Sequence, residues 1–333
     1  MPASGEVNDQ MISLFDKARS NTIKAATGDD GDGVIRVSTH SLIAMHHGAE
    51  SISLQAKKIR ALQSGAYVSP FKGRGMEFDE VRAYNPGDDV RTLDWRVTAR
   101  TGKPHTKLFR EERERAVLLW IDLRRPMLFA TQGAYKAVRA AQAAALLGWS
   151  AIQNGDRLGG LIFSETDHVE LRPRRGKRAL LHLVQKLADD PAWTPESHEP
   201  SAIDILQQAL LRLRRVAQPG CLIFMLSDFD GLDKQHTAHL ASLARHSDLV
   251  MVSIHDPLEA ELPPAGRYRV SDGQRILTVD TEPEDIRSHY QQRYRDRQAE
   301  LHRQCQHHGI YQIELSTADD PLSVLRQGLG GLR

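Results

Sequence analysis

The sequence predicts an α/β protein built on an open, doubly wound and mostly parallel β-sheet. A continuously apolar run at residues 117–121 and a second run at residues 221–227, apolar up to Ser227, are each followed by an aspartate, Asp122 and Asp228. Runs without polar alternation are typical of central parallel strands that are covered on both faces. Segments with apolar residues at helical spacing alternate with such runs along the chain, which is the pattern of consecutive βαβ units.

The first 115 residues are expected to precede this sheet. Residues 1–33 indicate a flexible arm, because a short amphipathic piece is followed by a linker rich in glycine and aspartate. Residues 34–115 are expected to form an N-terminal helical and extended region. Within it, residues 39–63 have helical spacing after an N-cap at Ser38 or Thr39, and we expect two helical segments joined near Gly48.

Residues 116–333 are expected to form the α/β domain. A typical element is the helix over residues 135–153, whose apolar side chains share one face and which ends before Gly155. A β-hairpin insertion is expected near residues 266–281, with a two-residue turn at Asp272 and Gly273. The remaining strands are expected at residues 157–163, 169–171, 249–254 and 310–315, and the remaining helices at residues 177–188, 202–216, 234–246 and 284–307.

Composition narrows the functional class. The chain has 44 Lys and Arg against 43 Asp and Glu, a net charge of +1, which argues against a dedicated nucleic-acid binder. Its two cysteines, Cys221 and Cys305, fit a reducing compartment. No apolar run approaches the roughly 20 residues needed to span a bilayer, and the first residues lack the pattern of a secretory signal. We therefore expect a cytoplasmic protein without membrane association.

A charge-dense stretch at residues 73–100 precedes the first strand of the domain. Acidic and basic side chains alternate there and are interleaved with aromatic ones, which is typical of a packed polar network and not of a solvated tail. The residues of this stretch that carry its motif are Gly73, Arg74, Gly75, Glu77, Phe78, Arg82, Tyr84, Pro86, Gly87, Asp88, Asp89, Arg91, Asp94, Trp95, Arg96, Ala99 and Arg100.

This pattern resembles the block that members of the bacterial "domain of unknown function 58" family carry ahead of a von Willebrand factor A-like domain. The resemblance extends from about Thr39 to the C-terminus. It implies a von Willebrand factor A-like sheet. It also implies partnership with a MoxR-type AAA+ ATPase and with other von Willebrand A-like proteins.

Two interpretations of the block remain open, a structural clamp and a partner-docking surface, because Arg and Trp serve both. A buried Trp95 would favour the clamp, and an exposed Trp95 would favour docking. The residues concerned are Arg82, Tyr84, Asp88, Asp89, Arg91, Asp94, Trp95 and Arg100.

The ends of the two apolar runs are the candidate site, because open α/β sheets bind ligands at the carboxyl ends of their strands. In the fold that the chain resembles, a metal is held by D-x-S-x-S after the first strand and by an Asp after the fourth. Here both hydroxyl positions are lost, to Arg124 and Pro126. Mg²⁺ requires oxygen ligands, whereas a guanidinium only donates hydrogen bonds. Bound Mg²⁺ on Asp122 and Asp228 is therefore the less favoured alternative, and no cofactor is expected.

We predict instead a degenerate metal site formed by Asp122, Arg124, Asp228 and Asp230, in which Arg124 or Arg125 takes the place of the cation. The alternative is that both arginines are solvated loop residues and that the aspartates cap the turns that follow.

The predicted function is a non-enzymatic protein-interaction module, an adaptor or partner of a MoxR-type ATPase. The main alternative is a metal-dependent hydrolase using Asp122, Asp228 and Asp230. No nucleophile elbow, phosphate-binding loop or H-E-x-x-H motif is present in the sequence. Nucleic-acid binding through the basic clusters at residues 172–175 and 212–215 is a weaker interpretation, which predicts affinity that falls steeply with salt.

Overall fold

The computed structural model describes residues 32–54, 77–85, 93–110, 115–165, 167–194, 204–271 and 276–330. These described residues fall into two compact units: those within Val68–Glu114 form the smaller unit, and the others form the larger one. This division differs from the three regions expected from the sequence, because residues 32–54 pack with the α/β unit. The expected flexible arm lies outside the described residues except for its last two.

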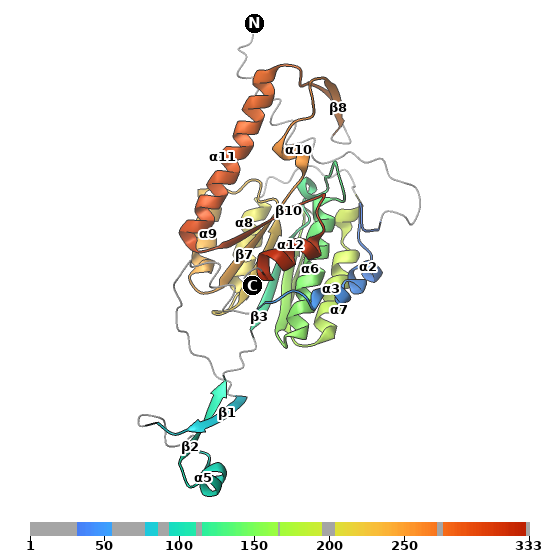
Figure 1. Cartoon of the computed structure of the whole chain (residues 1–333). Coiled ribbons are helices and arrows are strands. Elements are labelled where there is room, and N and C mark those ends of the chain that lie inside the picture. Colours follow the sequence, from blue (N-terminus) through green and yellow to red (C-terminus); the bar gives the residue numbers. More distant parts are fainter. Residues whose placement is uncertain are drawn as a thin grey trace. The chain divides into compact units, whose positions relative to one another are not determined.

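A six-stranded sheet forms the centre of the larger unit (Figure 1). Its spatial order is β10-β7-β6-β3-β4-β5, and all neighbouring pairs are parallel except β4 with β5. Counted along the chain, this is the doubly wound order 6-5-4-1-2-3. The strands are β3 (Ala116–Asp122), β4 (Arg157–Phe163), β5 (His168–Arg174), β6 (Leu222–Ser227), β7 (Asp248–His255) and β10 (Tyr311–Ser316). The predicted α/β, von Willebrand factor A-like fold is confirmed.

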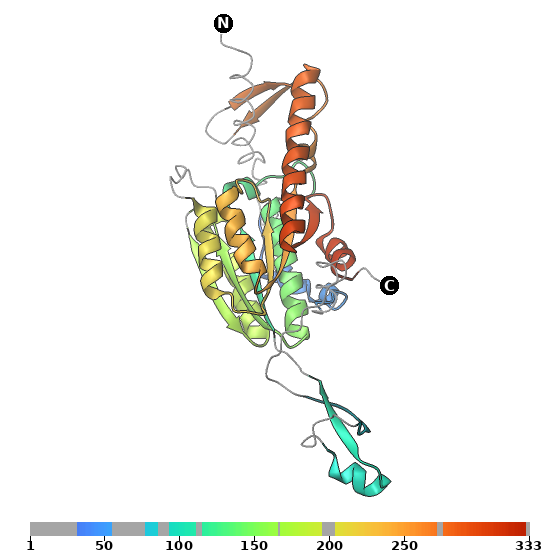
Figure 2. The same ribbon diagram turned by 90° about the vertical axis from the view of Figure 1, so that its left-hand side faces the viewer.

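Helices cover both faces of this sheet (Figures 1 and 2). Alternate residues of β3 therefore face different cores: Val117 and Leu119 lie in one apolar cluster, and Leu118 and Trp120 in the other. This is why the strand is continuously apolar in sequence. The first face carries α6 (Lys136–Gln153), α7 (Lys177–Ala188) and α12 (Pro321–Gly330); the second carries α8 (Ile205–Val216), α9 (Lys234–Ala244) and α11 (Glu284–His308).

The described N-terminal segment packs on the first of these faces. Its short helices are α2 (Thr39–Ala44) and α3 (His46–Ala49), and the predicted N-cap at Ser38 is confirmed by a capping box with Ser41. Ser150 Oγ on α6 donates to the Ile52 carbonyl at 2.8 Å, which anchors the end of the segment. The helices meet at Met45, so the predicted junction near Gly48 is wrong; Gly48 lies inside α3.

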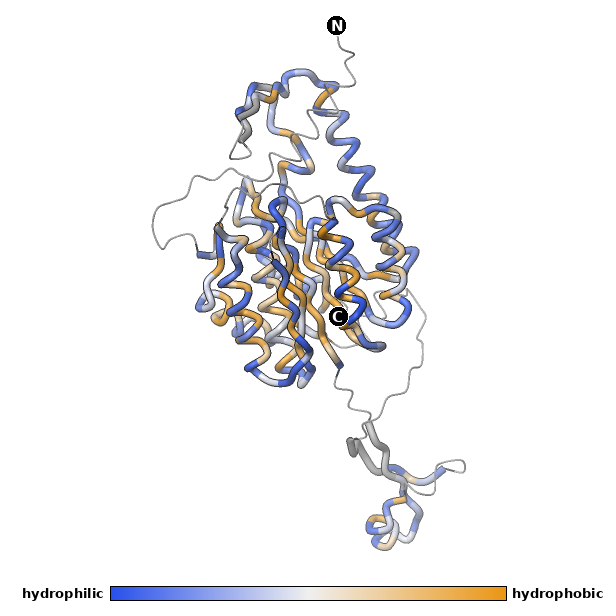
Figure 3. Tube along the Cα trace, turned by 180° about the vertical axis from the view of Figure 1, so that it is seen from behind, coloured by the Kyte–Doolittle hydropathy of each residue, from blue (hydrophilic) through white to orange (hydrophobic). Residues whose placement is uncertain are grey.

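The hairpin insertion is present as β8 (Arg267–Ser271) paired with β9 (Ile276–Asp280), and its expected turn at Asp272 and Gly273 lies outside the described residues. It follows the one-turn helix α10 (Pro257–Ala260) and precedes α11. The first half of α11 extends past the sheet (Figure 2), and most of the residues of this helix are hydrophilic (Figure 3). Two 3-10 turns, η3 (Arg125–Met127) and η4 (Pro191–Trp193), complete the larger unit.

Two elements of the larger unit differ from the sequence prediction. The edge strand β5 is longer than the predicted 169–171, because its residues alternate between exposed and half-buried and pair with β4 along most of its length. Helix α12 was not predicted, although it buries Leu325 and Leu329 in the apolar cluster of the first face.

The smaller unit is a two-stranded antiparallel sheet with one helix. Strand β1 (Glu77–Ala83) pairs with β2 (His105–Arg110), and α5 (Trp95–Thr101) lies between them in sequence. The extended part of the region expected over residues 34–115 thus includes a pair of strands. Helix α5 begins at an Asp94 N-cap and ends at Gly102, whose φ of 71° is the left-handed conformation that favours glycine at a helix end.

Candidate functional site

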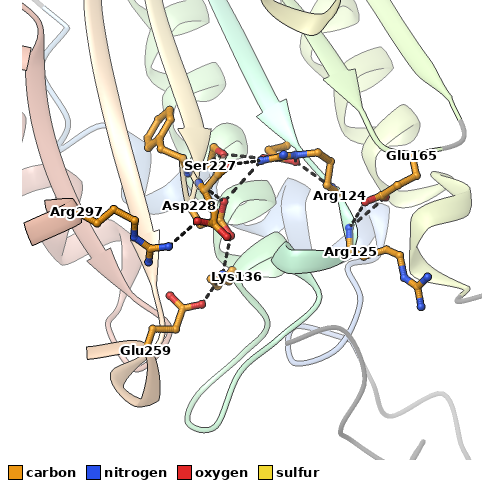
Figure 4. Close-up of polar contacts among 11 residues, drawn as sticks. Arg124, Arg125, Lys136, Glu165, Ser227, Asp228, Glu259 and Arg297 are labelled. Atoms are coloured by element: carbon orange, nitrogen blue, oxygen red, sulfur yellow. Dashed lines mark hydrogen bonds and ion pairs between the residues drawn. The ribbon is translucent and has the colours of Figure 1, made fainter. Parts of the chain in front are cut away.

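The carboxyl ends of β3 and β6 form the candidate site (Figure 4). The two strands are parallel neighbours, so Asp122, the last residue of β3, lies beside Ser227, the last residue of β6. Ser227 Oγ donates a hydrogen bond of 2.6 Å to Asp122 Oδ2. Asp228 follows at once, and both aspartates are buried. Two carboxylates removed from water in this way require compensating positive charge.

Arg124 supplies part of that charge. Its Nε lies 3.0 Å from both carboxylate oxygens of Asp122, and its Nη2 lies 2.7 Å from Oδ2. The same Nη2 approaches Asp228 Oδ1 at 3.7 Å. Burial by itself would lower the pKa of Arg124, but the adjacent Asp122 outweighs it and raises the pKa above its usual value. The guanidinium is therefore a fixed cation between the two strand ends.

Lys136 supplies the second cation, and the sequence analysis missed it. It is the first residue of α6 and is fully buried, with Nζ 2.7 Å from Asp228 Oδ2 and 2.6 Å from Glu259 Oε1. A cation at a helix N-terminus opposes the helix dipole, so these carboxylates must compensate it. Burial would raise the pKa of Asp228, but Lys136 and Arg124 lower it below its usual range. No local sequence pattern distinguishes this lysine from an exposed one.

The hydrogen-bond network around Asp122 and Asp228 extends to the ends of β7 and β10. Glu259 forms a capping box with Asp256 at the start of α10. The buried carboxylate of Asp256 accepts hydrogen bonds from Thr131 N, Thr131 Oγ1 and Thr317 Oγ1 at 2.7, 2.6 and 2.7 Å. Satisfied carboxylates thus connect the ends of β3, β6, β7 and β10.

Asp230 and Arg125, both named from the sequence, are oriented differently. The carboxylate of Asp230 accepts a 2.5 Å hydrogen bond from Arg297 Nη1 on α11, and its backbone carbonyl lies 3.5 Å from Arg124 Nη2. The backbone N–H of Arg125 donates to Glu165 at 2.8 Å, while its guanidinium points away from the aspartates (Figure 4). Arg124 is therefore the arginine that pairs with Asp122. Burial raises the pKa of Glu165, the carboxylate that accepts from the Arg125 N–H.

The residues present do not fit a magnesium ion. Both carboxylate oxygens of Asp122 are engaged by Arg124, and those of Asp228 face Lys136 and Arg124. Mg²⁺ needs near-octahedral oxygen ligands, and these positions are taken by hydrogen-bond donors. Within the ranges that the structure describes, no group of three or more His, Cys, Asp or Glu side chains is arranged to hold a metal ion.

We call the charge-dense stretch at residues 73–100 the signature block; its described residues lie in the smaller unit. Trp95 is 70% exposed, and Arg100 is exposed in the last turn of the same helix. Asp94 has a local structural role, because its carboxylate accepts hydrogen bonds from the N–H groups of Arg96 and Val97. The Tyr84 N–H donates to the Pro104 carbonyl at 2.9 Å, and Arg82 Nη1 donates to the Ala83 carbonyl at 3.2 Å. Asp88, Asp89 and Arg91 lie outside the described residues.

Comparison with known proteins places these features in context. Residues 80–300 match the model of a family described as "Protein of unknown function DUF58". The chain is 30% identical over 219 residues to uncharacterized protein Rv1480 of Mycobacterium tuberculosis and to uncharacterized protein Mb1516 of Mycobacterium bovis, covering 66% of this chain and 67% of each relative.

Two solved structures also show similarity. One is the conserved hypothetical protein BatB from Bacteroides thetaiotaomicron, with a TM-score of 0.42, 12% identity, and coverage of 65% of this chain and 97% of that one. The other is an aerotolerance-related membrane protein from Bacteroides fragilis, with a TM-score of 0.39, 14% identity, and coverage of 66% and 100%. In the described part of the present chain, every helix is too short or too polar to cross a membrane.

Proposed function

From the premise that the chain belongs to the DUF58 family, we propose that it is a non-enzymatic protein-interaction module that docks a MoxR-type AAA+ ATPase through its smaller unit. The partner follows from the resemblance of the signature block to members of that family. The docking role has a separate basis in the geometry of α5.

The observation that carries the docking role is the exposure of Trp95. An indole that is 70% exposed contributes little to the core of its own unit. Trp and Arg are the side chains most enriched among residues that dominate binding energy at interfaces. Asp94 and Gly102 define the ends of α5, so Trp95 and Arg100 are presented on a short, capped helix. An exposed Trp95 favours docking over the clamp interpretation.

The ion pairs at the sheet end support a non-enzymatic role. Metal-dependent hydrolysis needs a coordinated ion with an open position for water or substrate. Asp122 and Asp228, the residues that would hold such an ion, face Arg124 and Lys136, and the Asp230 carboxylate binds Arg297. We infer that Arg124 and Lys136 replace the cation and keep this end of the sheet closed without metal. The purified chain should then bind no Mg²⁺.

The test measures binding of the purified chain to the purified MoxR-type ATPase of the same host, with and without ATP. Trp95→Ala is expected to weaken binding by about 30-fold, since a central interface Trp contributes about 2 kcal/mol or more. Leu211→Ala is the matched control, because Leu211 is an exposed apolar residue (37%) on α8 of the larger unit. Asp94→Ala is unsuitable for this purpose because it removes the N-cap of α5.

The outcomes separate the parts of the proposal. If wild type and Trp95→Ala bind equally well, the docking role of Trp95 is wrong. If the ATPase is not bound in either nucleotide state, the proposed partner is wrong. If the purified chain alone binds Mg²⁺ by calorimetry, the replacement of the metal by Arg124 and Lys136 is wrong.

A further inference from the structure

The edge of the six-stranded sheet carries a concentrated positive charge. Strand β5 ends the sheet order, so among the described residues no strand pairs with its outer side. Arg172 and Arg174 are exposed on this strand, and Lys177 and Arg178 are exposed in the first turn of α7 directly after it. We call these four residues the β5 edge cluster. The sequence contains no Asp or Glu between Glu170 and Asp189.

The structure pairs none of these four cations with a carboxylate within the described residues. Other arginines of the same unit are paired, for example Arg267 with Asp280 and Arg297 with Asp230. A chain with a net charge of +1 has enough acidic residues to balance this edge locally. Within the residues that the structure describes, the edge cluster is thus a local excess of positive charge, with Glu170 as the one acidic residue on the same face of β5.

Folding alone does not account for this arrangement. Charged residues and proline on an edge strand prevent aggregation, and Arg172 with Pro173 already meets that need. Lys177 and Arg178 lie at the N-terminus of α7, where the helix dipole disfavours cations and where the Gly176 N-cap makes no side-chain hydrogen bond. Residues placed against the local electrostatic preference are candidates for binding an anionic partner.

The spacing of the cluster fits an extended acidic peptide. Burial alternates along β5, so Arg172 and Arg174 share one face and lie about 7 Å apart at the strand rise of about 3.3 Å per residue. Carboxylates at alternate positions of an extended peptide repeat at the same interval, and each can form a bidentate pair with a guanidinium. Pro173 lacks an N–H, so the side chains, more than added backbone pairing, would hold the peptide.

A single-stranded nucleic acid has a similar charge spacing, but it binds proteins through aromatic stacking in addition to phosphate contacts. The sequence contains no Phe, Tyr or Trp between Phe163 and Trp193, the stretch that includes the whole edge cluster. The observations therefore favour a peptide. We propose that the β5 edge cluster binds an extended acidic segment of a partner protein, at a site separate from Trp95.

The experiment measures the binding of fluorescent probes to the full chain by anisotropy at low and moderate salt. The probes are a 12-residue peptide of alternating Glu and Ser, the same peptide with Gln in place of Glu, and a 12-nucleotide oligo-dT. Arg172→Glu/Arg174→Glu is expected to weaken binding of the acidic peptide by at least about tenfold, because it removes two ion pairs and adds repulsion.

The matched control is Arg267→Glu/Arg269→Glu, which makes the same charge change at alternate exposed positions of β8. This control and Trp95→Ala should both bind the acidic peptide as wild type does, and the Gln peptide should not bind. The proposal is overturned if the acidic peptide does not bind at low salt, if both double variants lose binding equally, or if oligo-dT binds more tightly than the peptide. Because no ATPase is present, its outcome is independent of the proposed function.

Discussion

Replacing Lys136 with methionine tests the network at the sheet end most directly. The substitution keeps a long apolar stem but removes a fully buried ammonium group that lies 2.7 Å from Asp228 and 2.6 Å from Glu259. Asp228 keeps its 3.7 Å contact with Arg124, and Glu259 loses its 2.6 Å contact with the ammonium group. Removing one partner of a buried pair costs about 3–5 kcal/mol because the remaining charge stays buried.

The expected loss of stability is a large part of the free energy of unfolding, which is only about 5–15 kcal/mol for a domain. In a thermal unfolding experiment it corresponds to a decrease in Tm of about 10 °C, at about 2–4 °C per kcal/mol for a unit of this size. Lys177→Met is the matched control, because Lys177 is also the first residue of a helix but is exposed. Its effect should stay within about 0.5 kcal/mol.

The pH dependence separates lost charge pairing from poor packing. In wild type, the pKa of Asp228 is lowered in the folded state, so its contribution to stability is present above the unfolded pKa near 3.8 and is lost as the pH falls towards the folded value. In Lys136→Met, carboxylates buried without their cation should have raised pKa values, so the variant should become relatively more stable as the pH falls from 8 to 5.

A double variant completes this test. Lys136→Met/Glu259→Gln should recover part of the lost stability, because it removes one of the two buried negative charges that lose their contact with the ammonium group. The reasoning is refuted if the free energy of unfolding of Lys136→Met is within about 1 kcal/mol of the wild-type value, since the loss of one partner of a buried ion pair should cost more than that. An equal destabilisation at pH 5 and pH 8 would instead attribute the effect to packing.

Three further predictions follow from the same contacts. Arg124→Ser/Pro126→Ser restores the hydroxyls of D-x-S-x-S, but this variant should bind no Mg²⁺ by calorimetry because Lys136 still pairs with Asp228. Binding should require the further substitution Lys136→Met. If Arg124→Ser/Pro126→Ser alone binds Mg²⁺, the role of Lys136 is refuted. Asp94→Ala removes the N-cap of α5 and should reduce the stability of the smaller unit by about 1 kcal/mol. The loss should be measurable as faster amide exchange in α5, and unchanged exchange would contradict the capping role. Burial raises the pKa of Cys305 to about 12 and also raises that of Cys221, so a thiol reagent at pH 8 should label both only on unfolding; rapid labelling of the native chain would contradict this burial.

Several features could be read from the sequence because their cause is local. The apolar runs that became β3 and β6 indicated strands buried on both faces, and the periodicity of residues 135–153 indicated α6 nearly to the residue. The sequence also offered Arg124 or Arg125 as a partner of Asp122 or Asp228, and the structure pairs Arg124 with Asp122, two positions away. Boundaries were less accurate where tertiary packing decides them, as at Met45 and in the unpredicted α12.

The sequence by itself therefore determined the class of fold, the alternation of its strands and helices, and the presence of Arg124 and Pro126 beside Asp122. Only the tertiary structure decided which charges meet. Lys136 and Asp228 are 92 residues apart, and Lys136 and Glu259 are 123 apart, so no local pattern connects them. The same is true of exposure: Trp95 and Lys136 are each the first residue of a helix, yet one is 70% exposed and the other fully buried. Burial depends on what the rest of the chain places around a side chain, and that information is not contained in the residues beside it.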